Sequence, residues 1–163
     1  MRLIKHLFAP SAKGTFPADS LKRIHDAIAE DERRHRGEIC FAVESALHWR
    51  DVWNGVDSRQ RAEAAFARLR AWDTEANNGV LVYLLLADHR IEIVADRGLR
   101  ESVSPEQWRG ICQLMEERMR AGEPEEAVMR GVAEIGNLLA MYFPQREGEL
   151  DRDELPNAPV ILR

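Results

Sequence analysis

Oxygen-bearing side chains gather at both ends of one apolar stretch near the middle of this sequence. Residues 77–101, NNGVLVYLLLADHRIEIVADRGLRE, open with two asparagines and a glycine and close on a mixture of acid, arginine and glycine. Carboxylate and amide oxygens are the ligands that hard cations such as Ca²⁺ and Mg²⁺ prefer, and loops can bring them together. These residue types therefore indicate a cation site, provided that the fold places the two ends side by side.

Three predicted strands decide that question. The segment EICFAVESAL, from Glu38, alternates as a strand does; residues 80–87 are apolar throughout, like a central strand covered on both faces; IEIVAD alternates like a strand nearer an edge. A predicted helix joins the first two strands, so these should run parallel with a right-handed crossover. A turn at Asp88-His89 should send the third strand back antiparallel, with Asp96 opposite Leu81.

This topology collects polar residues at one end of the sheet, which we call the polar rim. Its members are Glu38, Asp73, Asn77, Asn78, Gly79, Asp96, Arg97, Gly98 and Glu101. The predicted ligands of a Ca²⁺ or Mg²⁺ ion are Glu38, Asn77, Asn78, Asp96 and Glu101, and no organic cofactor is expected. Gly79 and Gly98, predicted to lie opposite one another, would let the backbone approach the ligand closely.

A local interpretation of the same residues stays open. Asn77 and Asn78 suit the end of the preceding helix and the turn into the strand, and Asp96 and Arg97 suit a surface ion pair. The other end of the sheet offers less, because Asp88, His89 and Arg90 have the composition of a hairpin turn and no serine or cysteine nucleophile accompanies the histidine.

Helical periodicity predicts four helices around the sheet. They cover ADSLKRIHDAIAEDERRH, SRQRAEAAFARLRAW (capped by Ser58, with Trp72 on its inner face), SPEQWRGICQLMEERMRAG and PEEAVMRGVAEIGNLLAMYF. The order α-β-α-β-β-α-α predicts an α/β protein, a three-layer α/β/α sandwich with a small mixed sheet. We expect an N-terminal arm over residues 1–15, the domain over 16–144, and an acidic, disordered tail over 145–163.

Composition limits the classes of partner. The 163 residues fit one domain, and a formal net charge of −5 argues against nucleic acid as a ligand. No run approaches the roughly 18–20 apolar residues of a membrane span, so a cytoplasmic protein is expected, with weak peripheral membrane contact by the basic, partly apolar N-terminal arm. Cys40 and Cys112 lie in apolar surroundings and are predicted to be buried free thiols.

The segment from about Phe16 to Phe143 resembles the TPM domain family, which includes thylakoid-lumen proteins of photosystem repair and many bacterial proteins. The resemblance rests on RGEICFAVESAL, on WDTEANNGVLVYLLLADHRIEIVADRGL and on the closing pair of helices, and it is strongest to a short bacterial subgroup without membrane segments. It implies the same sandwich fold. Divalent-cation binding and weak acid-phosphatase activity are associated with that fold, and the matching positions are Asn78-Gly79, Asp88 and the loop 96–99.

Three functions follow as hypotheses, and one of them is a soluble structural subunit that binds no ligand. The first is a binding or interaction module, dependent on a divalent cation, which engages a protein partner in membrane-protein quality control or assembly. The alternative is a weak metal-assisted phosphomonoester hydrolase, in which the cation polarises the phosphoryl oxygen, Arg97 neutralises charge, and Asp96 or Glu101 serves as ligand or base. The sequence predicts no catalytic nucleophile.

Overall fold

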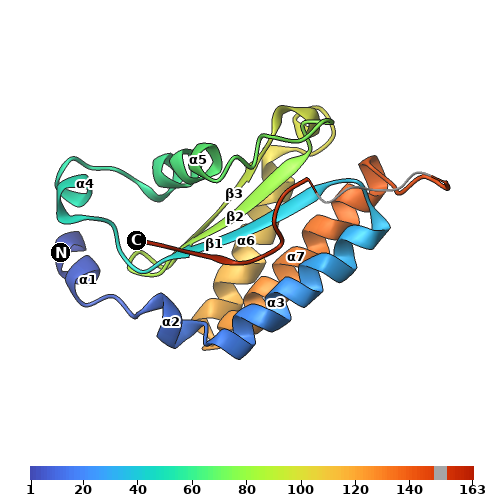
Figure 1. Cartoon of the computed structure of the whole chain (residues 1–163). Helices are drawn as coiled ribbons and strands as arrows, with labels where there is room; N and C mark the ends of the chain where they lie inside the picture. Colours follow the sequence, from blue (N-terminus) through green and yellow to red (C-terminus); the bar gives the residue numbers. More distant parts are fainter. Residues whose placement is uncertain (149–153) are drawn as a thin grey trace.

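A four-stranded mixed sheet forms the centre of the computed structural model, which describes residues 1–148 and 154–163 (Figure 1). The strands are β1 (Glu38–Glu44), β2 (Gly79–Leu85), β3 (Arg90–Ala95) and β4 (Val160–Leu162), in the spatial order β3-β2-β1-β4. β1 runs parallel to both of its neighbours, and β3 is antiparallel to β2. The predicted parallel pairing of the first two strands is therefore confirmed.

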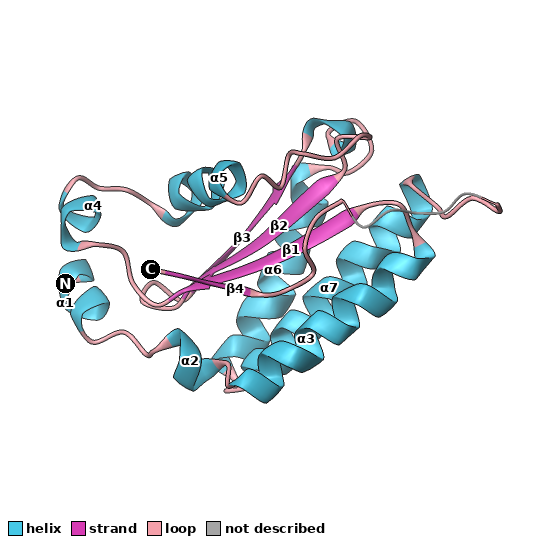
Figure 2. Ribbon diagram, in the orientation of Figure 1, coloured by secondary structure: helices cyan, strands magenta, loops and turns pink. Residues whose placement is uncertain are grey.

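Helices cover both faces of this sheet (Figure 2). They are α1 (Arg2–Leu7), α2 (Ala12–Thr15), α3 (Ala18–Asp31), α4 (Trp49–Trp53), α5 (Ser58–Arg68), α6 (Pro105–Arg120) and α7 (Pro124–Tyr142), with short 3₁₀ helices η1 (Glu32–Arg34) and η2 (Arg97–Leu99). The predicted order α-β-α-β-β-α-α is that of α3, β1, α5, β2, β3, α6 and α7, so the α/β sandwich is confirmed. None of the described helices has the length and apolar character that a membrane span requires.

The two central strands are buried along their whole length and divide the core in two. Side chains such as Ile39, Phe41 and Val82 pack against α3, α6 and α7. Their neighbours, such as Leu81 and Leu85, face the other way, toward the small residues of α5. Because successive side chains of a strand point to opposite faces, an uninterrupted apolar run is what a strand covered on both sides needs.

The hairpin between β2 and β3 differs from the prediction. Leu85 pairs with Arg90 and Leu81 pairs with Val94, so the connection spans residues 86–89 rather than a two-residue turn. His89 adopts a left-handed conformation, with φ of 51°. The register predicted for Asp96 is therefore wrong by two residues: Asp96 pairs with Gly79, donating its amide N–H to the Gly79 carbonyl at 2.9 Å.

Helix starts follow capping chemistry, with one correction. α6 begins as predicted, with Ser104 and Gln107 forming a capping box around Pro105. α5 is capped by Asp57 rather than Ser58, again through a capping box. It ends at Arg68, and Trp72 lies beyond it with about half of its surface exposed, so the prediction that this tryptophan faces inward was wrong.

The C-terminal segment was predicted to be disordered, but residues 160–162 form β4 beside β1 (Figure 1). Leu155 packs in the core on the α5 side of the sheet, and Leu162 is buried next to it. Three apolar residues after an acidic, proline-containing segment gave too short a pattern to be recognised as a strand. Residues 149–153 of the predicted tail lie outside the described residues, and the boundaries at 15 and 144 remain predictions.

We predict that Leu162→Ala lowers the free energy of unfolding by about 2 kcal/mol, because the substitution leaves a cavity beside β1. Arg163→Ala is the matched control; its side chain is exposed, and its effect should stay within about 0.5 kcal/mol. Urea unfolding followed by circular dichroism measures both. Equal stability of the two variants would contradict the packing of β4 on the sheet.

Candidate functional site

The polar rim forms at one end of the sheet, as the topology requires. Glu38 donates its amide N–H to the Asn78 carbonyl at 3.4 Å, which joins the starts of β1 and β2. Gly98 donates its amide N–H to the Asn77 carbonyl at 2.9 Å, and this bond brings η2 against the loop before β2. The ends of three strands therefore meet through backbone contacts, and loops 73–79 and 96–99 lie side by side.

The two rim glycines serve the chain's own packing. A Cβ atom at Gly79 would lie 1.9 Å from the Ala71 carbonyl oxygen, and one at Gly98 would lie 2.5 Å from the Ala76 carbonyl oxygen. Both positions require a residue without a side chain. The sequence analysis assigned these glycines to close approach of a ligand; in the structure the backbone of the neighbouring loop fills that space.

Two carboxylates of the polar rim, one of them the predicted ligand Glu38, already have partners within the chain. The carboxylate of Glu38, only 2% exposed, accepts the amide N–H groups of Glu154 at 3.2 Å and Leu155 at 3.4 Å. Asp73 is half-exposed and forms an ion pair with Arg70 at 2.6 Å. Glu38 therefore fixes the C-terminal segment to the sheet, and Asp73 forms a surface pair with a residue just after α5.

Asn78 and Asp96 each keep one buried oxygen without a hydrogen bond. Asn78 is fully buried; its side-chain Nδ2 donates to the Arg36 carbonyl at 2.8 Å, and its Oδ1 accepts nothing. Asp96 accepts the Arg97 amide N–H on Oδ1 at 2.7 Å, and its buried Oδ2 accepts no hydrogen bond. A buried polar atom without a partner costs roughly 1–3 kcal/mol, so the pair calls for an explanation.

The remaining rim residues are more open. Arg97 and Glu101 are exposed, and Asn77 adopts a left-handed conformation with φ of 52°, which asparagine tolerates better than most residues. In the part of the chain that the structure describes, no three His, Cys, Asp or Glu side chains stand together as metal ligands would. Any cation at the rim would thus depend on amide and backbone oxygens besides Asp96.

A groove of about 1040 Å³ runs along β3 between α5 and α6, and Asp96 lines its end at the rim. We call it the β3 groove; its lining includes Ser58, Phe66, Ile93, Asp96, Trp108 and Glu116. β3 is an edge strand, and side chains meet its outward backbone groups. Arg59 Nη1 donates to the Ile93 carbonyl at 2.7 Å, and Glu116 accepts the Ile91 amide N–H at 3.3 Å. These two bonds occupy outward backbone groups of β3 that could otherwise pair with another strand.

Neither cysteine has the properties of a nucleophile. Burial raises the pKa of Cys40 to about 12, and nearby Glu32 and Glu38 act in the same direction. Burial also raises the pKa of Cys112, in the lining of the β3 groove, to about 12. Both thiols are therefore protonated at neutral pH and weakly reactive. Cys40 is buried as predicted, whereas Cys112 is only partly covered.

Similarity to known proteins agrees with this architecture. The family model described as TPM domain matches residues 11–138, most of the chain. The protein belongs to the TPM domain family.

Two solved structures resemble this TPM domain. One is the NMR structure of the BA42 protein from the psychrophilic bacterium Bizionia argentinensis, with 28% identity and a TM-score of 0.80 over 93% of this chain and 98% of that one. The other is the solution structure of the N-terminal domain of a protein from P. gingivalis, with 15% identity and a TM-score of 0.61 over 81% and 83% of the two chains. The second similarity shows the fold alone. No match was found among curated proteins.

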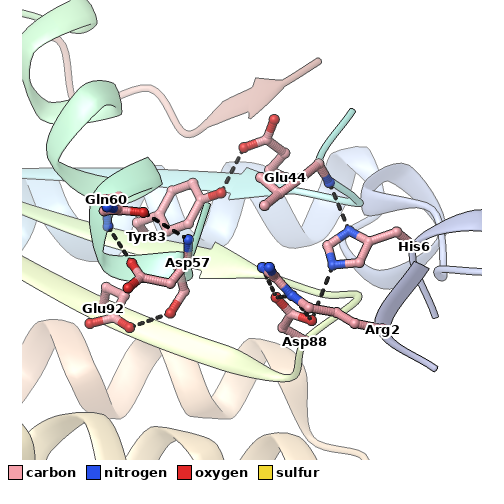
Figure 3. A network of polar contacts seen from close by, with 10 residues as sticks. Arg2, His6, Glu44, Asp57, Gln60, Tyr83, Asp88 and Glu92 are labelled. Carbon is pink, nitrogen blue, oxygen red and sulfur yellow. Dashed lines mark hydrogen bonds and ion pairs between the residues drawn. The ribbon is translucent and has the colours of Figure 1, made fainter. Parts of the chain in front are cut away.

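At the opposite end of this TPM domain lies a polar network that the sequence analysis missed (Figure 3). Asp88 accepts hydrogen bonds from Arg2 Nη2 at 2.7 Å and from His6 Nε2 at 3.1 Å. His6 Nδ1 accepts the Leu47 amide N–H at 2.9 Å, so the buried imidazole is neutral with its proton on Nε2. The only signal in the sequence was the spacing of Arg2 and His6, which lie one helical turn apart.

A second buried network crosses the sheet near its α5 face. Glu44, at the end of β1, accepts the Tyr83 hydroxyl at 2.6 Å (Figure 3). It also accepts two bonds from Arg61, both at 2.8 Å. Burial and the bond to Glu44 raise the pKa of Tyr83 well above its usual range. Glu44 is only 2% exposed, so its three bonds attach α5 to the sheet inside the protein.

We predict a pH-dependent cost for Asp88→Asn. Burial raises the pKa of Asp88, but the hydrogen bond and positive charge of Arg2, together with the hydrogen bond from His6, outweigh it and hold that pKa below its ordinary value. A depressed carboxylate pKa contributes stability that is present above the ordinary value of about 3.9 and is lost as pH falls through the folded-state value. The variant should be less stable by about 1–3 kcal/mol at pH 7.

The difference from wild type should shrink as the pH falls below about 4, because protonation removes the same charge from the wild-type protein. Asp73→Asn is the control; it breaks an exposed pair with Arg70 and should cost less than about 0.5 kcal/mol. Urea titrations between pH 3 and pH 7 measure both variants. A difference for Asp88→Asn that does not depend on pH would refute the electrostatic role of this carboxylate.

Proposed function

We propose that this TPM domain is a binding module whose partner-binding surface depends on a divalent cation at the polar rim. The observation that carries the proposal is the pair of buried, unpaired oxygens, Asn78 Oδ1 and Asp96 Oδ2. Both residues adjoin Gly79, since Asn78 precedes it and Asp96 pairs with it. Buried polar atoms in folded proteins almost always have a partner, so two such atoms at one loop end point to a ligand.

The donor atoms support a hard cation that binds weakly. They comprise one carboxylate, one amide oxygen and the exposed Glu101 in the turn after η2. Irregular sets of oxygen ligands suit Ca²⁺ better than Mg²⁺, which demands near-ideal octahedral geometry. Because few of the ligands are charged, we expect a dissociation constant of roughly 10⁻⁴–10⁻³ M, in the range of weak calcium modules.

The β3 groove supports a protein partner for the same module. Asp96 belongs both to the rim and to the groove, so a cation on Asp96 would order one end of the groove. A peptide segment that binds through its side chains suits this surface, because the groove is elongated along β3 and is lined by Phe66 and Trp108, while Arg59 and Glu116 already bond outward backbone groups of the strand. We propose membrane-protein quality control or assembly as the setting of such a module, and membership of the TPM domain family supports this proposal.

We predict saturable amide shifts near residues 77–79 and 96–101 when Ca²⁺ is added to the ¹⁵N-labelled protein. Asp96→Asn keeps the shape of the side chain but removes its charge, so it should weaken the affinity by about tenfold or more. Asp73→Asn makes the same chemical change at a rim carboxylate that is paired with Arg70, and it should leave the affinity unchanged. Saturable shifts of equal midpoint in both variants would locate the cation elsewhere, and their absence in the wild type would refute the cation site.

The hydrolase alternative has one observation in its favour, the exposed guanidinium of Arg97 directly after Asp96. An arginine beside a bound cation is suited to a phosphate ester. Under the binding-module proposal, we expect p-nitrophenyl phosphate to be hydrolysed no faster by the wild type with Ca²⁺ or Mg²⁺ than by Asp96→Asn. Cation-dependent turnover that falls about a hundredfold in both Asp96→Asn and Arg97→Ala would instead establish the hydrolase.

A further inference from the structure

The first helix, α1, turns polar side chains toward the protein and exposes its apolar ones. Arg2 and His6 lie on the inner side of α1, where both bond to Asp88. Ile4, Leu7 and the C-cap residue Phe8 lie on the opposite side and are 60%, 67% and 82% exposed. An amphipathic helix of a globular protein normally buries its apolar stripe, so this arrangement presents apolar side chains to the surroundings.

A second short helix continues the exposed apolar surface. Trp49 and Trp53 lie one turn apart on α4 and are 53% and 80% exposed, and no residue of α4 is buried. α4 contacts α1, and the two lie together at the end of the molecule near the N-terminus (Figure 1). We call these five residues the α1–α4 patch: Ile4, Leu7, Phe8, Trp49 and Trp53.

We propose that the α1–α4 patch docks this protein on the surface of an anionic lipid membrane. Tryptophan, phenylalanine and leucine are the side chains that enter the boundary between headgroups and acyl chains, and tryptophan favours this zone in particular. Two exposed cations flank the patch: Lys5 on α1, and Arg50, whose guanidinium lies 5.3 Å from the Trp49 ring centre. Together they outnumber Asp51, the single acid of the two helices, in a chain of net charge −5.

This charge distribution favours lipid over a second copy of the chain. A symmetric dimer through the patch would bring Lys5 and Arg50 of both copies toward one another, because each surface meets its own duplicate. An anionic membrane instead supplies opposite charge to these cations. The acidic remainder of the molecule would face away from the lipid, which orients the domain on the surface.

The anchoring of α1 makes the patch a preformed surface. Arg2 and His6 hold the helix to Asp88, and His6 also receives the Leu47 amide N–H. The patch lies at the end of the sheet opposite the polar rim, so its lipid binding does not depend on a cation at Asp96. Vesicle experiments in EDTA therefore test this inference separately from the proposed cation site.

The test is co-sedimentation of the full chain with vesicles in EDTA. Vesicles of equal parts phosphatidylglycerol and phosphatidylcholine should bind the protein at least about tenfold more strongly than pure phosphatidylcholine, and added salt should weaken the binding. Tryptophan emission should shift to the blue on binding. No binding to the anionic vesicles, or equal binding to both kinds, would overturn the proposal.

Variants of exposed residues locate the contact. Leu7→Ser with Trp53→Ser should reduce vesicle affinity by about tenfold or more, because it removes two apolar side chains from the patch. Trp72→Ser removes a half-exposed tryptophan outside the patch and should leave the affinity unchanged. Thermal unfolding midpoints of all variants should match that of the wild type, since each side chain is exposed.

Two further outcomes would count against the inference. Undiminished vesicle binding by the Leu7→Ser/Trp53→Ser variant would place the lipid contact elsewhere. Concentration-dependent dimerisation of the wild type in sedimentation velocity, abolished in this variant and without vesicle binding, would assign the patch to a second copy of the chain. The double variant Lys5→Glu/Arg50→Glu tests the attraction between these two cations and anionic headgroups. It should abolish the preference for anionic lipid.

Discussion

Burial of β1 and β2 on both faces is the constraint on which the rest of this structure depends. Every residue of these strands is buried, including Glu38 and Glu44 at the two ends of β1. An ionised carboxylate removed from water is costly unless it is bonded, so each end of the strand must supply donors. Arg61 and Tyr83 supply them for Glu44, and backbone amides of the C-terminal segment supply them for Glu38.

The two faces of the sheet are covered differently. The face with α3, α6 and α7 is a broad apolar core, whereas the other face is covered by the alanines of α5 and by a few leucines such as Leu155. The small side chains on this face leave space beside α5, and the β3 groove lies in that space between α5 and α6. Polar bonds from Glu44 to α5 and from Glu38 to the C-terminal segment replace part of the packing that a larger helix would provide.

The sequence predicted those features that depend on pattern and topology. The apolar run of β2 identified a strand covered on both faces, and the helix before it made the β1–β2 pair parallel, which brought Asn78 and Asp96 to the same end. The register of the β2–β3 hairpin could not be predicted, because it depends on the left-handed backbone of His89 and on a four-residue connection. Composition alone does not distinguish that connection from a two-residue turn.

Polar partners distant in sequence were the part that periodicity could not reveal. Pattern analysis of α1 on its own would turn Ile4, Leu7 and Phe8 inward, yet the helix buries the opposite side. The reason is local chemistry: a buried imidazole needs both nitrogens satisfied, and only the inward position lets His6 meet Asp88 and the Leu47 amide together. Satisfying that histidine fixes the rotation of the helix, and this rotation leaves the apolar stripe outside. The polar network and the exposed patch are thus two consequences of one helix orientation, and the cost of exposing the stripe is offset when a membrane covers it.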